Sequence, residues 1–119
     1  MKISDFEIRF YEGVLKAKPD HVDTLMILAD AYTRKGFYDK GLELDQRLSL
    51  LCKDDPVIFY NLACSFALTG KKSEALDTLE EAMRLGYRDM ALLLKDPDLK
   101  SLHDDIRFEA LIRQFPLEH

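Results

Sequence analysis

The chain has 119 residues, of which 47% are hydrophobic and 33% are charged, and its net charge is −5 at pH 7. This composition is typical of a soluble globular protein of one domain and excludes a disordered chain. The excess of acidic over basic residues, 22 against 17, argues against nucleic acid and against an anionic membrane surface as partners. No apolar run approaches the roughly 20 residues of a membrane span, and no signal peptide is recognisable, so a cytoplasmic location is expected.

Helical periodicity extends along the chain, and no segment shows the alternation of period two that indicates a strand. The first helix is expected over residues 4–18, with Ser4 and Glu7 forming a capping box. Its inward-facing apolar residues are expected to be Phe6, Phe10, Val14, Ile8, Tyr11 and Leu15. The next helix is expected over 21–35, with Asp20 as its N-cap.

Three further main helices and two or three short closing helices are expected. Pro56 should occupy the first position of one of them, directly after Asp55, because a proline there lacks only an N–H that has no helical partner. Another should end at Gly86. The main helices are predicted over 38–52, 56–69 and 72–85, and the two or three short helices near 89–94, 97–102 and 105–114.

The stretch 22–86 repeats itself once at a spacing of 34 residues. Large apolar, small, aromatic and glycine residues recur in the same order. The matching pairs are Leu25 and Phe59, Leu28 and Leu62, Ala29 and Ala63, Tyr32 and Phe66, Gly36 and Gly70, Gly41 and Ala75, and Leu42 and Leu76. A repeat of this length indicates stacked helical units. The small residues would let the axes of paired helices approach to about 8–10 Å. Gly36 and Gly70 would end the first helix of each repeat in a left-handed conformation.

This pattern resembles the tetratricopeptide repeat (TPR), a helix–turn–helix unit. The resemblance implies an all-α fold, a right-handed α–α superhelix, in a single domain over residues 1–116. Its expected parts are a half repeat (4–18), two full repeats (22–55 and 56–86) and a closing segment (87–116) like that of bacterial TPR proteins. Residues 117–119 are interpreted as the remnant of an expression tag.

The helix predicted over 56–69 is apolar on every side, which indicates that it is buried on every side. The closing segment is the expected cover, and a bound ligand is the alternative.

No motif for catalysis, phosphate binding or metal binding is present, and we expect no enzyme activity, no cofactor and no metal. Cys52 and Cys64 are predicted to lie roughly 12 Å apart along the helix axes, too far for a disulfide, so both should be free thiols. The acidic pairs 54–55 and 104–105 each precede a helix and are interpreted as caps.

The resemblance implies a protein-binding scaffold with a concave groove lined by the first helix of each repeat. The groove-facing residues would be Asp23, Met26, Asp30, Thr33 and Arg34 in the first full repeat, and Val57, Tyr60, Cys64, Ala67 and Leu68 in the second. For the second set, burial under the closing segment is an equal alternative. A lysine and asparagine clamp for chaperone tails is matched only at Asn61, so such a ligand is not expected.

Asp23 and Asp30 favour a peptide or helix that carries Lys or Arg. The alternative function is a structural or self-association module, possibly part of a larger protein, and the chain is expected to be a monomer or a weak homodimer.

Overall fold

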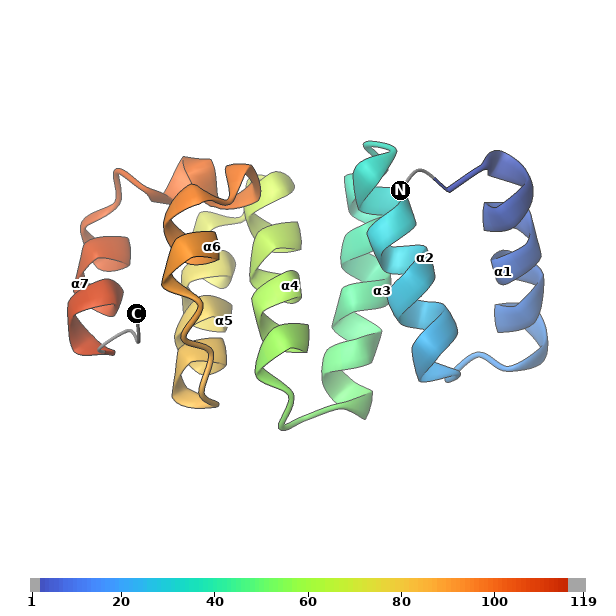
Figure 1. Cartoon of the computed structure of the whole chain (residues 1–119), viewed down its shortest axis with the longest axis horizontal. Coiled ribbons are helices and arrows are strands. Elements are labelled where there is room, and N and C mark those ends of the chain that lie inside the picture. The colour runs from blue at the N-terminus through green and yellow to red at the C-terminus, as the bar shows by residue number, and fades with distance from the viewer. Residues whose placement is uncertain (1–2, 116–119) are drawn as a thin grey trace. The chain divides into compact units, whose positions relative to one another are not determined.

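The computed structural model describes residues 3–115, so the expected tag remnant at 117–119 lies outside the described residues. Within 3–115 the secondary structure is helical and contains no strand, as predicted (Figure 1). Contacts group the chain into two compact units, Met1–Lys53 and Asp54–His119, which are described separately below. The single domain remains a prediction.

The first unit contains α1 (Asp5–Ala17), α2 (Val22–Arg34) and α3 (Tyr38–Leu51). Helices α2 and α3 form a hairpin, and α1 packs against α2 (Figure 1). The core of the hairpin comes from the apolar positions of the repeat: Leu25, Leu28, Ala29, Tyr32, Leu42 and Leu48 are all buried. Helices α2 and α3 approach closely at the predicted small residue Gly41, because a Cβ atom at this position would lie 2.6 Å from Thr33 Oγ1.

The ends of these helices follow local chemistry, with one correction. Ser4 and Glu7 form the predicted capping box of α1. The N-cap of α2 is His21, whose side chain accepts the Thr24 N–H at 3.3 Å, so the assignment of this cap to Asp20 was wrong. A neutral imidazole nitrogen is an acceptor and can replace the usual carboxylate.

The orientation predicted for Phe6 and Phe10 was also wrong. Their side chains are 71% and 59% exposed, while Ile8, on the opposite side of α1, is buried. Helix α1 packs on α2 through one face only, and that face carries Ile8 with the half-buried Tyr11 and Leu15. A helix with two apolar faces and one neighbour must leave one of these faces in water.

The second unit contains α4 (Pro56–Leu68), α5 (Lys72–Arg84), α6 (Met90–Lys95), the 3-10 helix η1 (Pro97–Leu102) and α7 (Ile106–Gln114). Asp55 caps α4, with Pro56 in its first turn, and Asp105 caps α7. Gly36, Gly70 and Gly86 have positive φ values of 85°, 78° and 117°, so each ends a helix as predicted.

The closing segment covers one side of α4 as expected, but Val57 is 49% exposed, so the prediction that this helix is buried on every side was wrong. Helix η1 packs on α4 and α5, and α7 packs on α5 (Figure 1). The shared core includes fully buried apolar side chains from both the repeat and the closing segment: Ala63, Leu79, Met83, Leu93, Leu99 and Leu102. The predicted ranges of the three closing helices agree with the structure, although the middle one is 3-10 rather than α.

Candidate functional site

Four of the predicted groove residues lie on the open side of α2. Asp23, Met26, Asp30 and Arg34 are exposed and occupy successive turns of the helix, with Met26 40% exposed. Arg34 Nε donates to Asp30 Oδ2 at 2.8 Å, so these two side chains form an i, i+4 ion pair along the surface. The result is a strip of mixed polarity, with Asp23 at the N-terminal end and an ion pair at the C-terminal end.

Thr33 is directed toward α3 rather than into this strip. Its hydroxyl donates to the Ala29 carbonyl at 3.1 Å, and its Oγ1 atom lies against Gly41. Its role in the structure is to pack the α2–α3 hairpin.

Tyr60 and Cys64 lie in the second unit, beneath the closing segment. They are only 3% and 6% exposed. The Tyr60 ring stacks on Tyr87 with 4.2 Å between centroids, and its hydroxyl donates to Asp96 Oδ2 at 2.7 Å. Burial, followed by the acidic groups nearby, raises the pKa of Tyr60 far above its usual value. In this structure both residues join α4 to the closing segment and offer no open surface.

Asp96 is a residue that the sequence reasoning did not single out, and it is the centre of this junction. Besides Tyr60, it accepts a long bond from the Cys64 thiol at 3.8 Å, while its other oxygen accepts the Asp98 N–H at 3.0 Å and caps η1. The Asp-Pro-Asp sequence signals the cap, but nothing in the sequence pairs it with a tyrosine 36 residues earlier.

The potential ligand atoms of Cys64, Asp96 and Asp98 lie within 4.8 Å of one another, the spacing of a metal site. However, both oxygens of Asp96 already hold hydrogen bonds that fasten η1 and α4. These bonds give the cluster a structural role, and we assign it no other.

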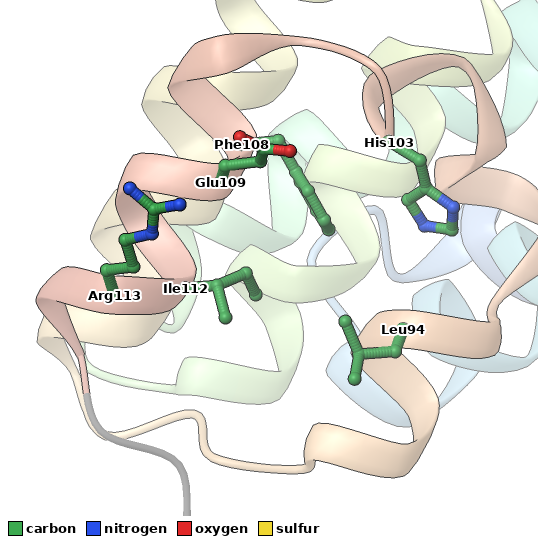
Figure 2. A pocket seen from close by; sticks show the side chains of 6 residues that line it. All are labelled: Leu94, His103, Phe108, Glu109, Ile112 and Arg113. Carbon is green, nitrogen blue, oxygen red and sulfur yellow. The ribbon is translucent and has the colours of Figure 1, made fainter.

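A separate cavity of about 400 Å³ lies in the second unit, between α6, the end of η1 and α7 (Figure 2). Its lining is apolar with charges at the rim: Leu94, His103, Phe108, Glu109, Ile112 and Arg113. The His103 ring lies 5.0 Å from that of Phe108, and its Nε2 atom is sealed from solvent without a hydrogen-bond partner among the described residues. Because water cannot reach this nitrogen, it is not available to a ligand in the cavity.

None of the helices in the described part of the chain is long and apolar enough to cross a membrane. Neither of the described cysteines, Cys52 and Cys64, forms a disulfide.

Comparison with known proteins supports the repeat. No family model matches the chain. The chain is 33% identical over 88 residues to a chloroplastic protein of Arabidopsis thaliana, a match that covers 71% of this chain and 26% of that protein. The crystal structure of MamA protein is similar with a TM-score of 0.71 and 26% identity, over 91% of this chain and 60% of the MamA chain. The chain thus spans less than two thirds of either protein. The 34-residue repeat, the paired helices and the likeness to MamA, a TPR-containing protein, show that the chain has a TPR-like helical-repeat fold.

Proposed function

We propose that the chain is a non-catalytic protein-interaction module, an adaptor or scaffold, that binds a basic peptide or helix on the open side of α2. The observation that carries this proposal is the exposed strip of Asp23, Met26, Asp30 and Arg34 on a helix whose other side is locked into the hairpin. A helix face with exposed apolar side chains, Met26 and Ile27, between two carboxylates suits a ligand that combines an apolar residue with Lys or Arg.

The two carboxylates are not equivalent. Asp30 is held by Arg34 at 2.8 Å, so a basic ligand must compete with an existing ion pair there. Asp23 lies in the first turn of α2, where the positive end of the helix dipole already favours its charge. A ligand cation at Asp23 replaces no side-chain partner that we observe among the described residues. We therefore expect Asp23 to contribute more to binding than Asp30.

The test is a titration of the ¹⁵N-labelled chain with two synthetic 12-residue peptides that share an apolar stripe and differ only in carrying Lys or Glu. The Lys peptide should shift the amide signals of residues 23–34, and the Glu peptide should not. Asp23→Asn should weaken binding by a factor of about 1.4 to 5, as expected for one exposed ion pair.

The matched control is Glu43→Gln, which removes an exposed carboxylate from α3 in the same unit. Equal losses for Asp23→Asn and Glu43→Gln would mean that net charge, rather than this strip, attracts the peptide. An absence of shifts in α2 with any basic peptide would overturn the proposal.

The alternative, a self-association module, rested partly on the apolar sequence of α4. The chain's own closing segment buries α4 side chains such as Tyr60, Cys64 and Ala67. Val57 is the large apolar side chain of α4 that remains exposed, at 49%, and sedimentation at several concentrations tests the alternative.

A further inference from the structure

One face of the first helix is open in the first full repeat and covered in the second. At the spacing of 34 residues, three positions of α2 correspond to three of α4: Met26 to Tyr60, Asp30 to Cys64 and Thr33 to Ala67. The three α4 residues are each no more than 7% exposed. By contrast, Met26 is 40% exposed, the Asp30 side chain is 65% exposed and Thr33 is half-buried. The repeat therefore builds this face twice, and only the α4 copy is covered.

This contrast is not a general difference in burial between the two helices. Leu28 and Leu62 occupy equivalent positions and are buried in both repeats. Ile27 and Asn61 are also equivalent, and they are exposed in both. What differs is the element that lies on the face.

In the second unit the element that lies on this face is the short helix η1, which packs on α4. A 3-10 helix has three residues per turn, so residues three apart lie on one side of it. In η1 these are Asp96, its N-cap, with Leu99 and Leu102. Asp96 accepts from the Tyr60 hydroxyl, and both leucines are fully buried in the cluster that also contains Tyr60 and Cys64. The α4 face is thus filled by one carboxylate and two leucines at a spacing of three residues.

The α2 face does not suit the same carboxylate. Against α4, Asp96 accepts from the Tyr60 hydroxyl at 2.7 Å and from the Cys64 thiol at 3.8 Å. The corresponding residues of α2 are Met26, which has no donor, and Asp30, which is itself a carboxylate. An acidic residue seated there would lose both donors and meet a like charge.

A basic residue fits the same place. It would lie beside Asp30, which already forms an ion pair with Arg34 at 2.8 Å. Asp23 lies three residues before Met26, about 4.5 Å along the helix axis, which is within reach of a Lys or Arg side chain. The exposed side chain of Met26 offers apolar contact to residues that take the places of the two leucines.

We propose that the α2 strip binds a short helix of a partner protein in the way that α4 binds η1. The partner segment carries Lys or Arg at one position and large apolar residues three and six positions later. This is the register of Asp96, Leu99 and Leu102 with the charge reversed. The inference rests on the proposed function, since it uses the same surface of α2, and it adds the conformation and the residue spacing of the ligand.

The probes are two blocked peptides with the sequence of residues 90–104, one unchanged and one carrying Asp96→Lys, each titrated into the ¹⁵N-labelled full chain. The Asp96→Lys peptide should shift the amide signals of residues 23–34. It should bind about 2- to 30-fold more tightly than the unchanged peptide, because an attractive charge pair replaces a repulsive one. Transferred NOEs between residues three apart should show that the bound peptide is helical.

A scrambled peptide tests the spacing. It has the composition of the Asp96→Lys peptide, but its lysines and leucines are moved out of the three-residue register. This peptide should bind α2 about tenfold more weakly, because its leucines cannot reach the helix face together with the base.

A variant of the chain tests the comparison of the two repeats directly. Asp23→Val/Met26→Tyr/Asp30→Cys gives α2 the corresponding side chains of α4 and alters only exposed positions. Under reducing conditions it should reverse the preference, so that the unchanged peptide binds more tightly than the Asp96→Lys peptide. The matched control is Asp39→Asn/Glu43→Gln, which removes two exposed carboxylates from α3 and should keep the preference of the parent chain.

The outcomes separate this inference from the proposed function. If the scrambled peptide binds α2 as well as the Asp96→Lys peptide, or if the bound peptide is extended, a basic ligand is still supported but the helical register is refuted. Shifts confined to residues 56–68 would mean that the peptide replaces the chain's own η1, and they would also overturn the inference. If the Asp96→Lys peptide gives no shifts in α2 while the Lys peptide of the previous section does, only the inference fails. If neither peptide gives shifts, both proposals fail.

Discussion

The contact between Gly41 and Thr33 permits a quantitative test of the helix pairing in the first unit. A methyl group added by Gly41→Ala would lie 2.6 Å from Thr33 Oγ1 and 3.5 Å from the Ala29 carbonyl oxygen. Thr33 cannot turn away freely, because its side chain is β-branched and its hydroxyl donates to that same carbonyl. Either the Thr33 bond breaks or α2 and α3 separate.

Two effects of opposite sign decide the outcome. Overpacking of this kind costs about 1–3 kcal/mol, while alanine in place of a helical glycine gains about 0.5–1 kcal/mol. We expect Gly41→Ala to lower the free energy of unfolding by about 0.5–2 kcal/mol. Gly13→Ala is the control, because its methyl group meets nothing and should give only the gain.

The second repeat shows how the clash can be relieved. The residues 34 positions after Thr33 and Gly41 are Ala67 and Ala75, and both are buried. The double variant Thr33→Ala/Gly41→Ala copies this pair. It should regain the stability lost in Gly41→Ala, with a coupling energy of about 1–3 kcal/mol between the two positions.

Urea unfolding followed through the amide signals of α2 and α3 measures these free energies in the first unit itself. A signal averaged over all helices of the chain would mix the unfolding of the two units. If the two substitutions prove additive, or if Gly41→Ala alone is stabilising, then α2 and α3 do not approach at this point and the pairing argued from the repeat is refuted.

Three other predictions follow from single positions. Gly36→Ala should destabilise by about 1 kcal/mol or more, because Gly36 has a φ of 85°; urea unfolding measures this, and a neutral result would contradict the left-handed turn. Ala63→Leu should cost about 1–3 kcal/mol because Ala63 is fully buried, whereas Ala110→Leu, at an exposed position of α7, should cost little; equal melting temperatures would show that the core is misassigned. The raised pKa of Tyr60 means that its contribution to stability is present below about pH 10, where the unfolded chain begins to ionise, and is lost as the pH rises further. The melting temperature should therefore fall less steeply between pH 9 and 11 in Tyr60→Phe than in the parent chain, and identical slopes would disprove the burial of the Tyr60 hydroxyl.

The candidate site was predictable only in part. The periodicity of α2 places Asp23, Met26 and Asp30 on one side of a helix whose other side repeats apolar residues, and these side chains are indeed exposed. Thr33 follows the same periodicity but bonds Ala29 and packs on α3, because its side chain lies at the boundary between the two faces. Whether a ligand uses the strip remains a prediction.

Most of the fold could be predicted from local features of the sequence. The spacing of Ala29 and Ala63, the positive-φ glycines, and Pro56 after Asp55 specify helix pairs, helix ends and helix starts through interactions within a few residues or through a repeated pattern. The closing helices were also visible in the sequence, since Asp96-Pro97 and Asp105 both mark helix starts. These features depend on residues that are close together in the chain or on a repeated pattern, so they can be recognised in the sequence alone.

Tertiary structure alone decided which of two apolar faces is covered. Both α1 and α4 carry apolar residues on more than one side, yet η1 covers Tyr60 and Cys64 of α4 while Phe6 and Phe10 of α1 remain in water. The sequence of a helix states that a face is apolar but not whether another element reaches it, because that depends on where the rest of the chain goes. The same reason explains why the bond from Tyr60 to Asp96, which joins residues 36 positions apart, could be found only in three dimensions.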